Sequence, residues 1–280
     1  MQAEVREALA TALLRAREAA ACLPLPSERM PGFTRADAFE VAAATVARRQ
    51  AAGDAVRGWK IGFTNRSIWP RYGVHAPIWA PVWASTLEML PACEAALSLA
   101  AFSQPRLEPE IVFGFGRAPA PGASRQELVA SLDWVAHGFE VVHTHFDGWR
   151  FTAPDTVADF GLHGRLLVGP RRPVADLGAD GSAAGADTFA DRLAILSLTL
   201  GEGSRPVDQG RGSAVLDGPI QALEHWLDAM TRETPDWRVQ PGDVVTTGTI
   251  TDAAPLLPGQ HWWTETDDPL LPGLRLETRG

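Results

Sequence analysis

Lysine, cysteine and tyrosine are scarce in this sequence of 280 residues, which contains two cysteines, one tyrosine and, among 25 basic residues, one lysine, Lys60. Cys22 and Cys93 show no CxxC spacing and belong to no larger cysteine framework. Neither a disulfide scaffold nor a thiolate metal site is therefore indicated. Lys60 is either an accident of an arginine-biased composition or needed where arginine fails, because arginine cannot give up its proton.

Long apolar runs and an excess of positive charge are also absent. No segment reaches the roughly 18 uninterrupted apolar residues of a membrane-spanning helix. The first 20 residues mix Glu and Arg among apolar positions, which is typical of an amphipathic helix and not of a signal peptide. The formal charge of -9 argues against a nucleic-acid or anionic-membrane partner, because either needs a basic patch. We therefore expect a soluble, cytoplasmic protein that acts on a small molecule.

The hydrophobic content of 45% is sufficient for one large core, so we expect a single domain over residues 1–280. Residues 1–55 form its N-terminal helical part. Within that part, Thr34 and Asp37 have the spacing of a capping box and predict the start of a second helix.

We expect residues 56–280 to form a β-rich core, because short β-rich runs there are separated by Gly, Pro and Asp. Helical patterns intervene at 125–136 and 219–232, and the Ala/Gly/Asp-rich stretch 175–187 is interpreted as a surface loop. This irregular alternation predicts an α+β fold and not a regular series of βαβ units. The Rossmann and P-loop fingerprints are both absent, so a nucleotide cofactor has no support.

Three glutamates have the pattern of a cation site. Glu108 and Glu110, in RLEPEIVFGFG, point to the same face of a predicted strand. Two like charges side by side repel each other unless they extend into solvent, which is usual for an isolated E-x-E, or are bridged by a cation. Glu140, at the predicted start of the strand HGFEVVHTHF, is flanked by apolar residues, where a carboxylate is rarely left unpaired. The three together favour a bound cation.

The chemistry of the ligands indicates which cation. Oxygen ligands with positions left open for water and substrate suit Mg²⁺ or Mn²⁺ better than Zn²⁺, which prefers His and Cys. His143 and His145 alternate at the end of the strand that carries Glu140 and would instead favour a transition metal. A lone H-x-H is more often a hydrogen-bonding pair, so we interpret His145 as a substrate contact.

Five motifs follow one another along the chain: GWKIGFT at 58–64, EPEIVF at 108–113, FEVVHTHF at 139–146, DTVADFGLHG at 155–164 and PGDVVTTGTITDAAPLLPG at 241–259. In this order they resemble the 2-keto-4-pentenoate hydratases of the fumarylacetoacetate hydrolase superfamily, which also includes 2-oxo acid decarboxylases. The resemblance covers nearly the whole chain. It implies a mixed β-roll with N-terminal helices packed beside it, and a homo-oligomer.

The resemblance also implies roles for individual residues. They are the metal ligands Glu108, Glu110 and Glu140, the catalytic lysine Lys60, and the substrate-binding residues Thr249 and Asp159. Two motifs depart from the family pattern. The usual V-A-D-N is V-A-D-F here, with Phe160 in place of the amide, and the acid that usually follows the lysine block is replaced by Ile78 or Trp79.

Tryptophan is frequent near these motifs and predicts an apolar or aromatic substrate pocket. The tryptophans concerned are Trp59, Trp69, Trp79, Trp83 and Trp149.

The predicted chemistry follows from a 2-oxo acid that chelates the cation, which then stabilises an enolate. Lys60, partly buried near the cation, should have a lowered pKa and transfer a proton near neutral pH. The predicted enzyme is a metal-dependent hydratase, a lyase of aromatic catabolism, which adds water to a 2-hydroxy-2,4-dienoate to give a 4-hydroxy-2-oxo acid. The alternatives are a 2-oxo acid decarboxylase or C–C hydrolase on the same scaffold, and a non-catalytic binding or partner subunit.

Overall fold

The computed structural model describes residues 1–280, apart from the side chain of Arg71. Its helices are α1 Ala3–Ala19, α2 Pro26–Arg29, α3 Arg35–Ala51, α4 Trp69–Tyr72, α5 Arg125–Val129, α6 Ala153–Ala158, α7 Ala183–Ile195 and α8 Pro219–Glu233. Its strands are β1 Val56–Gly62, β2 Ile78–Trp83, β3 Leu87–Met89, β4 Glu94–Ser98, β5 Arg106–Phe115, β6 Leu132–Val142, β7 His163–Val168, β8 Arg172–Pro173, β9 Ser197–Glu202, β10 Arg205–Arg211, β11 Val244–Thr249, β12 Ala254–Pro255, β13 His261–Thr266 and β14 Arg275–Arg279.

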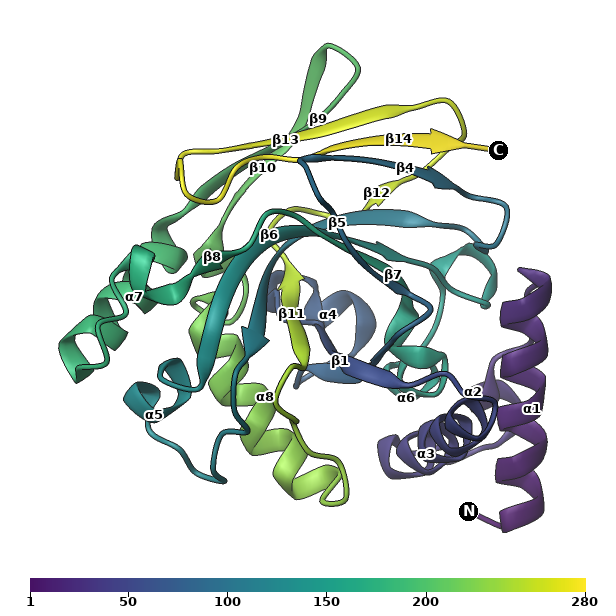
Figure 1. Ribbon diagram of the computed structural model, residues 1–280. Coiled ribbons are helices and arrows are strands. Elements are labelled where there is room, and N and C mark those ends of the chain that lie inside the picture. Colours follow the sequence, from purple (N-terminus) through teal and green to yellow (C-terminus); the bar gives the residue numbers. More distant parts are fainter.

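The strands form two mixed sheets. The larger sheet has nine strands and runs β2-β1-β11-β5-β6-β7-β3, with β12 paired to β5 and β8 to β6. The smaller sheet has five strands in the order β10-β9-β13-β14-β4 and lies above the larger one in Figure 1. Helices α1 to α3 lie beside the larger sheet on one side, and α5, α7 and α8 lie on the other (Figure 1). This is the predicted α+β arrangement, a curled mixed sheet with N-terminal helices.

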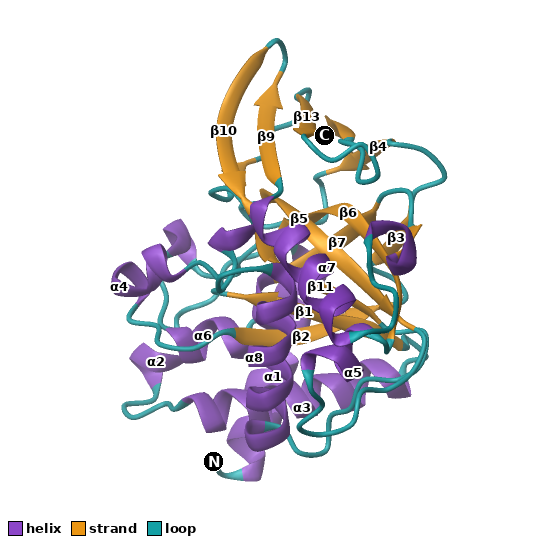
Figure 2. Cartoon of the chain, turned by 90° about the vertical axis from the view of Figure 1, so that its left-hand side faces the viewer, coloured by secondary structure: helices purple, strands orange, loops and turns teal.

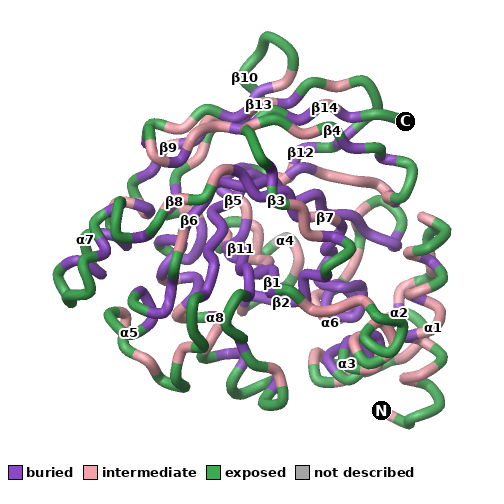
Figure 3. Tube along the Cα trace, viewed as in Figure 1, coloured by how far each residue is buried: buried purple, intermediate pink, exposed green. Residues whose placement is uncertain are grey.

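Burial is concentrated in the larger sheet. Figure 3 shows the buried segments gathered along β1, β5, β6 and β11, whereas helix ends and hairpin tips are exposed. Residues on both faces of β5 are buried: on one face Phe113 packs on Phe189 of α7, and on the other Val112 joins an apolar cluster of residues from β2, β6, β7 and β11 inside the curled sheet. Figure 2 shows the β9–β10 hairpin projecting beyond the rest of the molecule. None of the helices in the part of the chain that the structure describes is long and apolar enough to cross a membrane.

Local sequence signals set the start of helix α3, and side-chain contacts join α3 to α1. The predicted capping box is confirmed: Thr34 accepts from the backbone N–H of Asp37, whose side chain accepts in return from the backbone of Thr34. Helix α1 packs on α3, where Arg48 donates to Glu7 and Thr11 of α1. The first strand begins at Val56, directly after the helical part.

Two predicted elements were wrong. The helical pattern at 125–136 forms a helix only over Arg125–Val129 and then becomes β6 at Leu132, because pairing with β5 outweighs local propensity. The predicted loop 175–187 contains the start of α7, which Ser182 caps by accepting from the backbone N–H of Gly185.

Candidate active site

Three glutamate side chains meet on one face of the larger sheet. Glu108 and Glu110 lie on β5, and Glu140 lies on β6 directly opposite Glu108. One carboxylate oxygen from each residue lies within 4.8 Å of the other two. The three glutamates therefore converge as a cation site requires. The predicted position of Glu140 at a strand start was wrong, since β6 begins at Leu132 and Glu140 lies near its end.

The hydrogen bonds of this cluster leave room for a cation. Glu110 Oε2 accepts from Gly248 N at 2.6 Å and from Thr246 Oγ1, and Glu140 Oε1 accepts from His163 Nδ1 at 2.7 Å. The second oxygens, Glu110 Oε1 and Glu140 Oε2, are buried and accept no hydrogen bond from the residues that the structure describes. A buried carboxylate oxygen is costly unless a donor or a cation faces it. The residues present therefore fit a divalent cation that takes oxygen ligands.

The pKa values indicate excess negative charge in the same place. Burial, opposed by Lys60 and reinforced by Glu140, raises the pKa of Glu108 to about 7. Burial and repulsion from the other two carboxylates raise the pKa of Glu110 well above its ordinary value. Burial acts in the same direction on Glu140, but Lys60 and His163 outweigh it and lower the pKa of that carboxyl. A cation would relieve this repulsion.

Lys60 lies beside the glutamate cluster. It is on β1, its side chain is 3% exposed, and its Nζ donates to the carbonyl of Gly161 at 2.9 Å and lies 3.4 Å from Glu140 Oε2. The predicted lowering of its pKa was wrong for the protein without a cation. Burial does lower the pKa of Lys60, but the three glutamates outweigh burial and raise it. The sequence neighbours of Lys60 are apolar, whereas its neighbours in space are charged.

An unusual turn supplies the carbonyl that holds Lys60. Phe160, Gly161 and Leu162 follow α6 with φ angles of 55°, 59° and 66°. Left-handed backbone costs roughly 1–2 kcal/mol for a residue with a side chain, so the surrounding structure must stabilise this turn. A Cβ atom on Gly161 would lie 2.8 Å from Ala80 Cβ, and close packing therefore requires glycine there.

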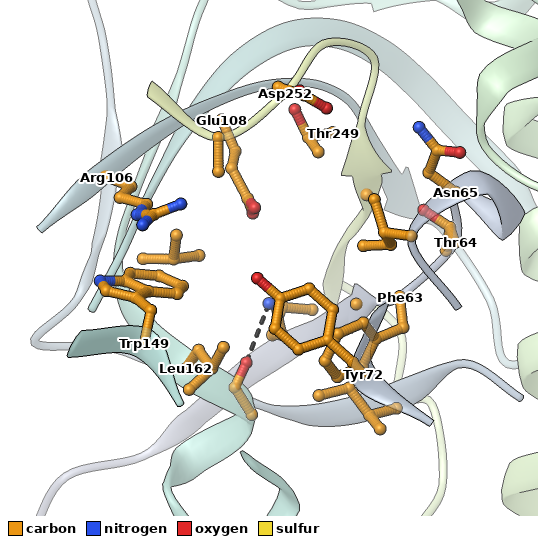
Figure 4. Close-up of a pocket in the computed structure, with 18 of the residues that line it drawn as sticks. Phe63, Thr64, Asn65, Tyr72, Arg106, Glu108, Trp149, Leu162, Thr249 and Asp252 are labelled. Atoms are coloured by element: carbon orange, nitrogen blue, oxygen red, sulfur yellow. Dashed lines mark hydrogen bonds between the residues drawn. The ribbon is translucent and has the colours of Figure 1, made fainter. Parts of the chain in front are cut away.

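A pocket of about 170 Å³ opens onto Lys60 and Glu108. Figure 4 shows Glu108 pointing into it, with Tyr72 and Trp149 on one side and Thr249 and Asp252 on another; its dashed line is the bond from Lys60 to Gly161. The aromatic part of the wall is continuous, because Phe151 stacks on Tyr72 with ring centroids 5.2 Å apart and lies 5.9 Å from Trp149. The pocket thus has charged side chains, Lys60 and Glu108, on one part of its surface and apolar side chains on another.

The predicted substrate-binding residues are divided between two places. Thr249 lines the pocket, and its hydroxyl donates to the carbonyl of Thr251. His145 and Asp159 are fully buried and bonded to each other, with His145 Nδ1 2.5 Å from Asp159 Oδ1, and neither is among the described residues that line the pocket. Their role as substrate contacts stays a prediction.

Most of the tryptophans from which the sequence predicted an aromatic pocket do not line it. Of the five tryptophans singled out, Trp149 lines the pocket and Trp69 donates to the carbonyl of the pocket residue Phe63. The other three, Trp59, Trp79 and Trp83, are buried core residues. Ile78, one of the two residues at which the sequence was expected to depart from the family pattern, lies on the pocket wall and pairs with Gly62. The wall at this point is apolar.

Two site residues escaped the sequence analysis. Arg106 lines the pocket and places its guanidinium carbon 4.2 Å from the centroid of the Trp149 ring. It lies two residues before Glu108 on β5, so the alternation of the strand could have placed it on the same face. His163, which orients Glu140, lies on β7, and its motif carried no indication of that contact.

Curated relatives resemble the chain over most of its length, although no family model matches it. The chain is 29% identical over 243 residues to the 2-hydroxyhexa-2,4-dienoate hydratase of Comamonas testosteroni, covering 86% of this chain and 84% of that protein. It is 25% identical over 260 residues to the 2-keto-4-pentenoate hydratase of Paraburkholderia xenovorans, covering 92% and 90%.

Solved structures share the fold. The 4-oxalocrotonate decarboxylase from Pseudomonas putida G7, complexed with magnesium and adipate, matches with a TM-score of 0.87 at 21% identity, covering 99% of this chain and 98% of that one. The fumarylpyruvate hydrolase from Pseudomonas aeruginosa, in complex with Mn²⁺ and pyruvate, matches with a TM-score of 0.60 at 13% identity, covering 80% and 89%. The glutamate cluster of this chain thus occurs in a fold of which these two solved examples hold divalent cations.

Proposed function

We propose that this chain, a homologue of the 2-keto-4-pentenoate hydratases within the fumarylacetoacetate hydrolase superfamily, is a metal-dependent hydro-lyase that hydrates a 2-hydroxy-2,4-dienoate. The observation that carries the proposal is the convergence of Glu108, Glu110 and Glu140 beside Lys60, with two buried carboxylate oxygens that accept no hydrogen bond from the described residues. Such a cluster suits Mg²⁺ or Mn²⁺. When bound, a divalent cation supplies Lewis-acid polarisation to a chelating 2-oxo acid.

Other steps of the proposed reaction are assigned to residues that line the pocket. Lys60, protonated in this environment, gives a proton to the terminal carbon of the dienol, and the proton lost from the 2-hydroxyl restores it. Water then adds its oxygen to C4 and its proton to C3 of the resulting 2-oxo-3-enoate. Thr249 and Arg106 offer polar contacts in the pocket, and Phe63, Val142 and Leu162 supply the apolar part of its lining that limits the access of bulk water.

The product of the reaction tests the proposed function. Purified protein incubated with Mg²⁺ and 2-hydroxypenta-2,4-dienoate should consume the dienol and form 4-hydroxy-2-oxopentanoate, identified by NMR in ²H₂O, with deuterium incorporated at C3 and C5. Release of CO₂ from a 2-oxo diacid, with the dienol left unchanged, would assign the protein to the decarboxylases. Tight binding of the dienol without turnover would assign it to non-catalytic partner subunits.

The affinity for the cation should depend on pH in a defined direction. Because the pKa of Glu108 is about 7 without a cation, this carboxyl is protonated below that pH, and binding a cation must release its proton. The raised pKa of Glu110 acts in the same direction. The apparent Kd for Mn²⁺, measured by electron paramagnetic resonance of the free ion, should rise by at least about tenfold for each pH unit below 7, because each proton released on binding contributes a factor of ten. A Kd constant between pH 5 and 7 would contradict the assignment of these ligands.

Several finer features stay predictions of the sequence. They are the choice between Mg²⁺ and Mn²⁺ in the cell, a role in aromatic catabolism, a homo-oligomeric assembly, and a cytoplasmic location. The single domain over residues 1–280 is likewise proposed, since Arg17 of the helical part donates hydrogen bonds to His163 and Gly164 of the β-rich core.

A further inference from the structure

A residue of the N-terminal helical part reaches behind the glutamate cluster. Arg17 lies near the end of α1 and is partly buried. Its guanidinium donates to the carbonyls of His163 at 2.7 Å and Gly164 at 3.1 Å, and to His143 Nε2 at 2.9 Å. It also lies 5.0 Å from the centroid of the Phe160 ring, in the turn that holds Lys60. One side chain thus contacts both segments that support the site.

The two carbonyls lie at an irregularity of the sheet. Between β6 and β7 the register shifts, so that Val141 pairs with Arg165 but Val142 pairs with His163. Gly164 is the extra residue of this β-bulge. Bulges leave backbone groups outside the ladder and turn side chains to a new face. Arg17 donates to the carbonyls of His163 and Gly164, the backbone groups on the N-terminal side of the shift.

The bulge determines where His163 points. Paired residues face the same side of a sheet, so pairing with Val142 places His163 on the face that carries Glu140. Without the extra residue, strand alternation would turn His163 to the opposite face. With it, His163 Nδ1 reaches Glu140 Oε1 at 2.7 Å, while His163 Nε2 lies 2.8 Å from Thr86 Oγ1. Glu140 is thus oriented by a ring that the bulge orients.

The chemistry at Arg17 requires arginine. An arginine only donates hydrogen bonds, so His143 Nε2 must accept and the His143 ring is neutral. Burial, followed by the charge of Arg17, lowers the pKa of His143 well below its ordinary value, in agreement with this state. Three acceptors, two on β7 and one on His143 directly after β6, match the planar fork of a guanidinium, which a single ammonium cannot cover.

We infer that Arg17 is a positioning residue for the cation site, which acts by holding the His163–Gly164 bulge and thereby the carboxylate of Glu140. The inference rests on the proposed cation site. It assigns α1 a part in catalysis, although α1 supplies no ligand.

Replacing Arg17 tests this role through cation binding and backbone exchange. In Arg17→Met, the Kd for Mn²⁺ should rise about tenfold, the lower end of the range for residues that orient metal ligands. Amide hydrogen exchange at residues 160–166 of the cation-free protein should become faster. Arg17→Lys keeps the charge and part of the hydrogen bonding, and should give an intermediate Kd.

Two control variants separate positioning from general loosening of the helix. Arg15→Met changes an exposed arginine of the same helix, and Arg48→Met removes the bonds from α3 to Glu7 and Thr11 of α1 without touching the site. Both should leave the Kd for Mn²⁺ within twofold of the parent. If the Kd rose as much in Arg48→Met as in Arg17→Met, the effect of Arg17 would come from the packing of α1 alone, and the inference would be overturned.

The failure of this inference can be distinguished from that of the proposed function. If the parent binds Mn²⁺ and turns over the dienoate but both Arg17 variants bind Mn²⁺ within twofold of the parent, the inference on Arg17 alone is wrong. If the parent binds no Mn²⁺, the proposed function is wrong. Amide hydrogen exchange at residues 160–166 tests separately whether Arg17 holds the His163–Gly164 bulge. An unchanged exchange rate in Arg17→Met would show that it does not.

Discussion

Replacing Lys60 by arginine and by methionine should lower kcat by roughly 100-fold or more in both variants, the usual scale for loss of a general acid or base. Methionine removes the amine, and arginine keeps the charge but does not release its proton. Cation binding should survive in both, because the carboxylates that would hold the ion are unchanged. Steady-state kinetics with the dienoate and Mn²⁺ titration measure the two quantities separately.

A rescue experiment distinguishes proton transfer from steric misfit of the larger arginine. Lys60 lines the pocket, so truncation to alanine leaves its place accessible to small solutes. Ethylamine added to Lys60→Ala should restore part of the activity, and guanidinium should not. An active Lys60→Arg enzyme would show that positive charge alone is needed, and that the single lysine is an accident of composition.

Replacing Glu110 by glutamine should weaken Mn²⁺ binding by roughly 100-fold or more and abolish activity, an effect larger than that of residues outside the ligand set. The design is conservative, since the glutamine carbonyl still accepts from Gly248 N and Thr246 Oγ1 while its amide replaces the free Oε1. The melting temperature of the cation-free protein should not fall. Burial and repulsion raise the pKa of Glu110, so a neutral side chain is at least as stable there.

Glu277→Gln is the matched control, because Glu277 lies on β14 of the smaller sheet and pairs with Arg279 at the surface. It should bind Mn²⁺ like the parent. Chelation by EDTA should inactivate the parent reversibly, with activity restored by Mg²⁺ or Mn²⁺. Parent-like Mn²⁺ affinity in Glu110→Gln would place the cation elsewhere and remove the basis of the proposed function.

Local patterns were sufficient for the features that depend on near neighbours in the chain. The capping box of α3 and the shared face of Glu108 and Glu110 follow from spacing alone, because helix caps and strand alternation are properties of a few consecutive residues. The family resemblance was also readable, since its motifs are short and ordered. These features supplied the fold class, the metal chemistry and Lys60.

Local patterns failed where pairing partners lie far apart in sequence. The segment 125–136 has a helical pattern, yet from Leu132 it is a strand because β5 and β7 flank it. The direction of the Lys60 pKa shift likewise depends on Glu140, which is 80 residues away in the chain. An apolar sequence context predicts a lowered pKa, and the charges that oppose it become visible only in the folded protein.

Sequence by itself therefore determined which chemical groups this protein possesses and which short segments present them on one face. Tertiary structure alone decided that Glu140 stands opposite Glu108, that His163 orients Glu140, and that Arg17 from α1 holds the bulge behind it. The physical reason is that strand register and bulges arise from contacts summed over the whole sheet. No window of a few residues contains those contacts.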